Sequence, residues 1–309
     1  MAGLFSKLFG AAKEKPEVDP TLFNKVRSHL AAKGMGAKNR LMSSTFIKGA
    51  PEVDNQLHEM ENALKTASFV DPLYHMEVPA RSIDGINQEK RFLNQFDSGS
   101  SSGALNGDRR KRLSDEAFGY TGSPKGDTRE KYGFATNPGY KYGPDPGAFG
   151  YGSYLFDFAP ERVGNRTTVS FGDSLDDFHD GGHPLILKDE RTFYAPLADD
   201  IDFVLKNPPY DAGDRAALKR AASDLGKKAL GELPGTRYME AQFHGPLTLD
   251  DVSGAYLDRH TFRPEDDLMV KMSDEYGYPL YDYQGCWHNC KDFEPGKTLL
   301  RDMNYFADF

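Results

Sequence analysis

Residues 237–245 most constrain what this chain can fold into, because their side chains alternate in character at successive positions. A β-strand points successive side chains to opposite faces of its sheet, so Met239, Ala241 and Phe243 should face an apolar core. The opposite face collects a phenol, a carboxylate, an amide and an imidazole, from Tyr238, Glu240, Gln242 and His244. Such a row is costly to bury. The pattern therefore indicates the working face of a site, with Glu240 at its centre.

Composition excludes two classes of protein. The 38 Lys and Arg residues are outnumbered by 47 Asp and Glu residues, and the net charge of −9 argues against a nucleic-acid-binding protein. No stretch approaches the roughly 20 apolar residues that a membrane-spanning helix needs. A chain of 309 residues is long enough for one or two domains.

The fold class expected from the order of patterns is α+β, with helices first and a strand-rich domain after them. Residues 1–18 are expected to be a flexible tail or a secretion signal, residues 19–80 a helical subdomain, and residues 81–309 the main domain. In the helical part Leu57, Met60 and Leu64 recur at the spacing of one buried stripe. Gly34, Gly36 and residues 49–51 are expected to divide it into short helices.

Within the main domain, strands are expected at residues 89–96, 153–158, 166–171 and 192–197, besides residues 237–245. Residues 214–231 predict a helix, because Asp214 can cap its start and an apolar stripe follows. A second helix is expected at residues 264–276. The Gly- and Tyr-rich residues 119–152 are typical of functional loops over a rigid sheet.

Two segments raise the question of a metal. Cys286 and Cys290 flank His288, but two thiols and one imidazole fall short of a four-ligand structural zinc site. We expect them to be ordinary structural cysteines in a chain that is no disulfide scaffold. The acidic residues 173–183 could bind a divalent cation, yet a Gly- and Asp-rich run is more often a solvated loop. No metal is expected to be required.

Standard catalytic motifs give no lead. The chain lacks a GxGxxG segment after a strand, a phosphate-binding GxxxxGK[ST] loop and a zinc-binding HExxH segment. What remains is three polar segments in chain order: Arg91 with Gln95, then Ser170 with Ser174, then Glu240. This order resembles the Arg–Ser–Glu pattern of mono-ADP-ribosyltransferases, a family whose split β-sheet grips NAD in a central cleft.

A longer resemblance supports the same family. Residues 94–99, 131–133, 168–174, 238–247 and 276–280 resemble successive blocks of the bacterial DUF3626 family. That family is related to ADP-ribosyltransferase effectors of the CteC type, which modify threonine on host ubiquitin. The resemblance covers roughly residues 91–287. It departs where Leu93 stands at the position expected for the arginine. Tyr238 replaces the first Glu of the Glu-x-Glu motif, so arginine is not the favoured acceptor.

The resemblance implies roles for particular residues. Glu240 would stabilise positive charge on the ribose and accept a proton, as carboxylates do in glycoside hydrolysis. Arg91 would clamp the NAD diphosphate, and Ser170, or alternatively Ser174, would hold the nicotinamide ribose. The remaining NAD-binding candidates are Gln95, Tyr132, Phe134, Tyr238 and Gln242, with Tyr132 or Phe134 stacking on nicotinamide. His244 and Gln242 would orient either the acceptor or Glu240.

The leading hypothesis is a secreted bacterial effector that transfers ADP-ribose from NAD to a protein hydroxyl in a host cytosol. The acceptor would be a threonine, on the resemblance one of host ubiquitin. An NAD glycohydrolase and a catalytically inactive binding module of the same fold are the alternatives, with action inside the bacterial cytoplasm as the other location. A Gly- and Tyr-rich structural protein of a virus or phage is a fourth reading.

Overall fold

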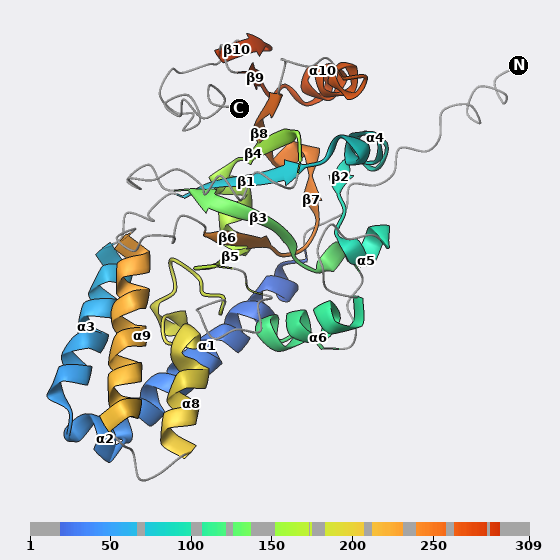
Figure 1. The fold of residues 1–309 in the computed structure, drawn as a ribbon. Coiled ribbons are helices and arrows are strands. Elements are labelled where there is room, and N and C mark those ends of the chain that lie inside the picture. Colours follow the sequence, from blue (N-terminus) through green and yellow to red (C-terminus); the bar gives the residue numbers. More distant parts are fainter. Residues whose placement is uncertain are drawn as a thin grey trace, which may run out of the picture.

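The computed structural model describes residues 19–66, 72–99, 107–121, 126–136, 152–172, 174, 183–206, 212–230, 239–257, 263–282 and 285–290. They form a mixed fold in which helices lie on one side of a large sheet and at its ends (Figure 1). The helical N-terminal region and the sheet agree with the expected α+β class.

Within the described ranges, ten strands belong to two sheets. The strands are β1 (Leu73–Val78), β2 (Arg91–Phe92), β3 (Lys131–Thr136), β4 (Tyr154–Phe158), β5 (Thr167–Ser170), β6 (Glu240–Phe243), β7 (Leu247–Thr248), β8 (Val252–Leu257), β9 (Leu280–Asp282) and β10 (Gly285–His288). The eight-stranded sheet has the order β10-β9-β8-β4-β1-β3-β6-β5, and β2 pairs with β7 separately. Only β8 and β9 run parallel among the described pairs.

The α-helices are α1 (Pro20–Ser43), α2 (Thr45–Lys48), α3 (Pro51–Thr66), α4 (Ala80–Glu89), α5 (Gln95–Ser98), α6 (Gly107–Phe118), α7 (Pro160–Val163), α8 (Ala198–Lys206), α9 (Ala212–Leu230) and α10 (Glu265–Tyr276). Short 3-10 turns are η1 (Gly126–Thr128), η3 (Gly164–Arg166), η4 (Glu190–Thr192), η5 (Ala195–Leu197) and η6 (Leu249–Asp251). The helices expected at residues 214–231 and 264–276 are therefore confirmed as α9 and α10.

Helix α1 is longer than expected. Asp19 begins it by accepting a hydrogen bond from the Thr21 backbone N–H. The helix then runs through Gly34 and Gly36, so the prediction that these glycines divide the segment is wrong. Gly34 serves close packing instead, because a Cβ there would lie 2.3 Å from the Arg191 carbonyl oxygen. The real breaks come at Ser44 and at Pro51, where α3 starts.

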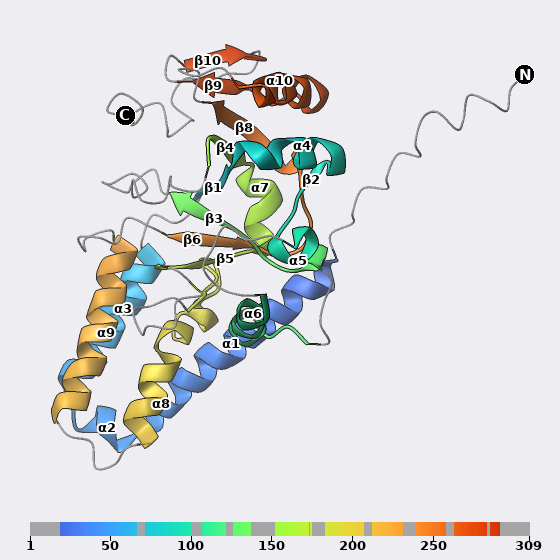
Figure 2. The same ribbon diagram turned by 45° about the vertical axis from the view of Figure 1, so that its right-hand side comes forward.

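Helices α3 and α9 lie side by side in both ribbon views (Figures 1 and 2). The stripe of Leu57, Met60 and Leu64 is buried, as the spacing predicts. Gly226 of α9 allows the close approach, since a Cβ there would stand 3.3 Å from the Met60 Cα. Two segments far apart in the chain thus form one helical layer, and Asp214 lies in the first turn of α9 rather than before it.

Three expected elements differ from the structure. The strand expected at residues 89–96 is reduced to β2, because the Asn94 side chain accepts from the backbone N–H groups of Phe96 and Asp97 and begins α5. The strand expected at residues 192–197 is instead parts of η4 and η5. Residues 73–78, expected within the helical region, form β1 in the middle of the sheet.

The two faces of the sheet differ, although the second face also carries a small apolar cluster of Phe134, Leu155, Tyr256 and Tyr281. One face packs into the main apolar core, through side chains such as Val169, Ala241, Phe243, Tyr74, Met76 and Phe156. The alternation that predicts Met239, Ala241 and Phe243 in the core is confirmed. On the other face the register aligns Ser170 with Glu240, and Glu240 with Phe134. This second face is called the polar face below, and it carries the candidate site.

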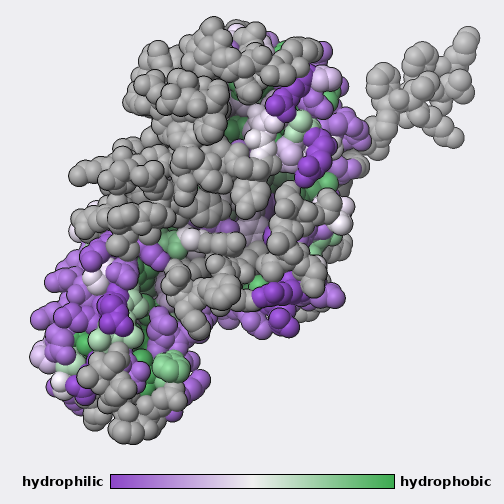
Figure 3. Space-filling view, viewed as in Figure 1, coloured by the Kyte–Doolittle hydropathy of each residue, from purple (hydrophilic) through white to green (hydrophobic). Residues whose placement is uncertain are grey.

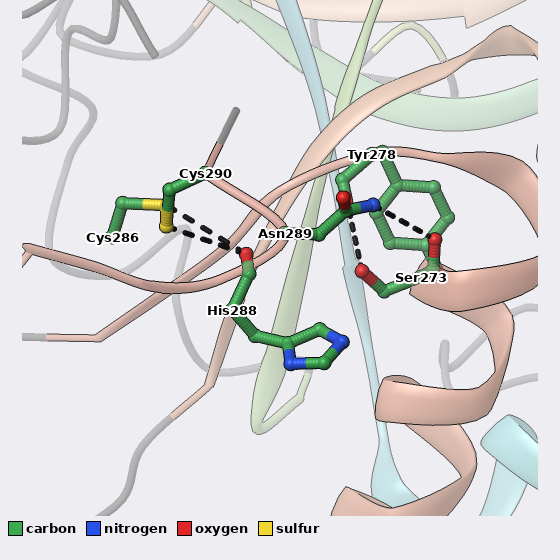
Figure 4. The surroundings of a disulfide bond; sticks show 6 residues. All are labelled: Ser273, Tyr278, Cys286, His288, Asn289 and Cys290. Carbon is green, nitrogen blue, oxygen red and sulfur yellow. Dashed lines mark hydrogen bonds between the residues drawn. A yellow bond between two sulfur atoms is a disulfide. The ribbon is translucent and has the colours of Figure 1, made fainter. Parts of the chain in front are cut away.

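At the far end of the sheet, Cys286 and Cys290 form a disulfide across the end of β10 (Figure 4). The Asn289 side-chain amide donates to the backbone carbonyls of Ser273 and Tyr278 (3.2 and 3.4 Å). The disulfide therefore closes the turn after β10, and Asn289 within this turn joins it to the end of α10, which gives the cysteines a structural role. The expectation that both cysteines are structural is confirmed.

On the face shown in Figure 3, the helical part is hydrophilic along its outer edge, and apolar residues lie between its helices. Within the described ranges, no helix combines the length and apolar character needed to cross a membrane.

Candidate functional site

Strand register places the candidate residues in rows on the polar face. Ser170, Glu240 and Phe134 occupy one row across β5, β6 and β3. Thr168, Gln242 and Tyr132 occupy the next row. The face is buried: Glu240 is 5% exposed, and Ser170 and Gln242 are fully covered. The structure thus brings five of the sequence-predicted residues, Ser170, Glu240, Gln242, Tyr132 and Phe134, onto one surface.

Glu240 is held by a converging set of donors. Its Oε1 accepts from the Ser174 backbone N–H (3.1 Å), from the Ser174 hydroxyl (2.5 Å) and from Gln242 Nε2 (2.8 Å). Three hydrogen bonds to one oxygen fix the orientation of the carboxylate. Ser174 is therefore a direct partner of Glu240, and its place in the site comes from the turn after β5.

The Gln242 side chain links Glu240 with Ser170 and Thr168 of β5. Its Nε2 also donates to Ser170 Oγ (2.9 Å), whose own proton goes to the Gly172 carbonyl (2.9 Å). Its Oε1 accepts from Thr168 Oγ1 (2.7 Å). Every polar atom of the Gln242 amide is engaged, so this side chain positions Glu240 and Ser170 rather than meeting an acceptor.

His244, the residue after β6, is the last member of the network on this strand. Thr168 has given its only proton to Gln242, so Thr168 Oγ1 must accept from His244 Nε2–H (2.9 Å). His244 Nδ1 then accepts from the Tyr120 hydroxyl (2.6 Å). The imidazole is neutral: burial first, and then the charges of Lys131 and Arg166, lower its pKa to about 3.

His244 also packs against the rings of Phe23 and Phe118. With both nitrogens engaged and 1% of its surface exposed, it has no access to an incoming acceptor. Of the two roles expected for His244, orienting Glu240 through the hydrogen-bond chain fits this environment, and contacting the acceptor does not.

Sequence reasoning missed His75. His75 lies on β1 on the polar face, opposite Phe134, and its ring stacks on that of Phe134 at a centroid distance of 5.0 Å. Its Nδ1 is 2.6 Å from Asp157 Oδ1 and its Nε2 is 2.8 Å from Thr136 Oγ1. The alternation of residues 73–78, with Tyr74, Met76 and Val78 buried in the core, is the signal that could have found it.

Tyr132 is occupied by its neighbours. Its hydroxyl donates to Glu130 Oε1 (2.7 Å). Burial above all, and then the charges of Glu130 and Glu240, raise its pKa far above the ordinary value. The Glu130 pKa is itself raised by burial, and Ser114 donates to Glu130 Oε2 (2.9 Å). Tyr132 therefore stays protonated. It lies opposite Gln242, in the row next to that of Glu240.

Arg91 lies away from this network. It belongs to the separate β2–β7 pair, and its nearest carboxylates are Asp127 (3.8 Å) and Glu89 (3.9 Å). Gln95 is in the first turn of α5, so the expectation that Arg91 and Gln95 share a strand face is wrong. No contact found among the described residues joins either of them to Ser170 or Glu240.

Arg110 provides positive charge beside the polar face instead. It stands one helical turn before the fully buried Ser114, on the inner side of α6. Its guanidinium carbon lies 5.5 Å from the centre of the Tyr132 ring. Its Nε is buried and has no hydrogen-bond partner among the described residues. Arg110 was not singled out from the sequence, where it is one of several basic residues in a row.

Two expectations lie partly outside the described residues. Tyr238 is not described, and of residues 173–183 only Ser174 and His183 are. His183 pairs with Asp199 (3.1 Å). Across the part of the chain that the structure describes, no group of three or more His, Cys, Asp or Glu residues is arranged to hold a metal ion.

We compared the chain with known protein families and with curated protein sequences. No model of a known protein family matches the chain, and no curated protein sequence matches it.

Proposed function

We propose that this chain is a mono-ADP-ribosyltransferase with the split-sheet fold of that family, which moves ADP-ribose from NAD to a protein hydroxyl. The observation that carries the proposal is Glu240, a buried carboxylate whose Oε1 accepts three hydrogen bonds on the polar face of the sheet. The Arg–Ser–Glu order and the resemblance to DUF3626 blocks point to the same chemistry.

The chemistry needs a carboxylate whose position is fixed beforehand. Cleaving the bond between nicotinamide and ribose develops positive charge at the ribose C1″ atom, as in glycoside hydrolysis. A carboxylate held in place stabilises that charge without reorganising during the step. It can also take the proton of the attacking hydroxyl. Ser174 and Gln242 provide this fixed orientation for Glu240.

The neighbouring residues take supporting roles. Ser170 holds Gln242 and the turn at Gly172, which in turn places Ser174. Phe134 stands between Glu240 and His75 on the polar face and is the better candidate for contact with nicotinamide. Tyr132 is less suited, because Glu130 takes its hydroxyl and Arg110 covers its ring.

We assign the grip on the NAD diphosphate to Arg110 rather than Arg91. A guanidinium binds phosphate oxygens in a bidentate manner, and this requires donors that are not committed to carboxylates. Arg91 lies near Asp127 and Glu89. Arg110 instead sits over Tyr132, a cross-strand neighbour of Gln242, with a buried Nε that lacks a partner among the described residues.

The acceptor and the site of action rest on the resemblance alone. It favours a threonine hydroxyl, on host ubiquitin, modified by a secreted effector in the host cytosol. Action inside the bacterium is the alternative location. If water replaces the hydroxyl, the same site acts as an NAD glycohydrolase, and if turnover has been lost, it is a binding module.

Isotopically labelled NAD separates these functions. The purified chain is incubated with NAD labelled in its adenylate part, with and without a cell lysate and with purified ubiquitin. Label transferred to a protein supports the proposal, and mass spectrometry of the product names the acceptor residue. Nicotinamide release without any labelled protein identifies a glycohydrolase. Binding of NAD without release identifies a binding module, and absence of binding contradicts the proposal altogether.

A further inference from the structure

We infer that Thr136 is itself an acceptor, so that this chain attaches ADP-ribose to its own Thr136 hydroxyl with His75 as the base. The inference rests on the proposed function and adds a modification site to it. It is carried by a hydrogen-bonded series of hydroxyl, imidazole and carboxylate that no step assigned to Glu240 uses: Thr136, His75 and Asp157.

The three side chains come from three adjacent strands of the sheet. His75 on β1 stands directly opposite Asp157 on β4, and Thr136 is at the end of β3. The His75 Nδ1 to Asp157 Oδ1 distance is 2.6 Å, and the His75 Nε2 to Thr136 Oγ1 distance is 2.8 Å. Nucleophile, base and orienting group within hydrogen-bond reach of one another is the arrangement that activates a hydroxyl.

The direction of these hydrogen bonds favours activation. A carboxylate only accepts, so His75 Nδ1 must carry the proton that it shares with Asp157. When the ring carries this one proton, Nε2 has a lone pair that can accept from the Thr136 hydroxyl 2.8 Å away. His75 is 2% exposed, so water does not compete for that lone pair.

Thr136 faces the reaction that Glu240 would promote. Phe134 is the cross-strand partner of Glu240, and Thr136 follows it by two residues on the same face of β3. Diagonal neighbours of this kind lie about 7 Å apart, a separation that a ribose ring can bridge. Thr136 is only partly buried, whereas His75 beneath it is covered.

The step balances without any further reactant. The bond between ribose C1″ and the nicotinamide nitrogen breaks, and its electron pair leaves with nicotinamide. A bond forms between Thr136 Oγ1 and C1″, and the hydroxyl proton passes to His75 Nε2. The resulting imidazolium is stabilised by Asp157, 2.6 Å from Nδ1.

The test is self-modification in the absence of any other protein. Wild-type chain is incubated with NAD, its intact mass is measured, and the modified residue is mapped by peptide sequencing, while released nicotinamide is quantified in parallel. We expect one ADP-ribose per chain, at Thr136.

Thr136→Val removes the hydroxyl at nearly constant shape and should abolish the modification, and Thr136→Ser should keep it. Asp157→Asn should slow it at least about tenfold. Thr66→Val, at an exposed helix end, is the matched control and should behave as wild type.

Each alternative outcome is decisive. Nicotinamide release with no ADP-ribose on Thr136, or modification that persists in Thr136→Val, overturns this inference and leaves the proposed function standing. Equal rates in wild type and Asp157→Asn overturn the role of the His75 base. Absence of nicotinamide release from the chain alone overturns this inference. The proposed function falls with it only if the reactions with lysate and ubiquitin also transfer no label.

Discussion

Glu240 at the start of strand β6 and His244 just after its end lie on the same sheet face and are buried to a similar degree, yet they differ in chemistry. Glu240 at one end brings a carboxylate oxygen that three donors hold in place. His244 at the other end is neutral, and its two ring nitrogens engage hydroxyl groups among aromatic rings. Burial of polar groups therefore does not by itself indicate a site, and our proposal rests on the fixed carboxylate of Glu240 instead.

His244 and His75 are both buried, but their ring nitrogens have different hydrogen-bond partners. His244 meets only the hydroxyls of Tyr120 and Thr168 through its ring nitrogens, which suits a neutral link in a positioning network. His75 meets a carboxylate on one side and a hydroxyl on the other, which suits a base. Two histidines of similar burial thus have different hydrogen-bond partners, and only the partners of His75 suit the base that we propose.

Ligand binding should depend on the Glu240 end and its flanking arginine. Arg110→Met keeps the length of the side chain and removes the charge. A lost bidentate contact to phosphate of about 1.5–3 kcal/mol corresponds to roughly 10–100-fold weaker binding of NAD or ADP-ribose, measured by calorimetry. The unfolding midpoint should change little, because the guanidinium of Arg110 contacts only one ring face among the described residues.

Arg91→Met is the matched control for Arg110→Met. It removes the same charge from β2 and should leave the dissociation constant within about twofold of wild type, well under one kcal/mol. The reverse ranking, with Arg91→Met the weaker binder, would return the diphosphate to the arginine that the sequence pattern first suggested.

Stability against acid should depend on the His244 end. The pKa of the His244 imidazole is lowered from 6.5 to about 3 in the folded chain. Between these pH values the unfolded chain therefore holds a proton that the folded chain does not. The stabilisation is complete above pH 6.5 and is lost as the pH falls toward 3. Its slope is about 1.4 kcal/mol per pH unit.

Urea unfolding of wild type and His244→Gln at several pH values isolates this contribution. The variant lowers stability at neutral pH but should lose the slope that His244 causes, so the two curves converge as the pH falls. Parallel curves would show that His244 is not the group that titrates, and would contradict the account of a neutral buried imidazole.

The sequence predicted β6 well because one local pattern determines it. Strict alternation from Met239 to Phe243 reports which side chains meet the core, and the structure confirms it. Helix α9 and the stripe on α3 were also predicted, since helical periodicity is a local signal. The prediction of a strand at residues 89–96 was wrong because the Asn94 side chain caps a short helix there, and this capping outweighs strand propensity.

The site was only partly predictable, because its contacts join distant segments. Glu240, Ser170 and Gln242 were named from polar positions on their own strands. His75, Asp157 and Arg110 are 165, 83 and 130 positions away from Glu240 in the numbering. Sheet order brings β1 and β4 into the same sheet as β6, and Arg110 of α6 approaches through its packing on the Tyr132 ring. Arg91 was proposed as the diphosphate ligand from the order of residues along the chain. That order does not reveal that Arg91 belongs to the separate β2–β7 sheet.

The central claim is that Glu240 promotes cleavage of NAD, and Glu240→Gln tests it most directly. The amide has nearly the same shape, so the fold should be kept while the negative charge is lost. We predict that the rate of nicotinamide release falls by about 10²–10⁴-fold, with the thermal unfolding midpoint close to that of wild type. Release at the wild-type rate from a folded Glu240→Gln protein would contradict the claim.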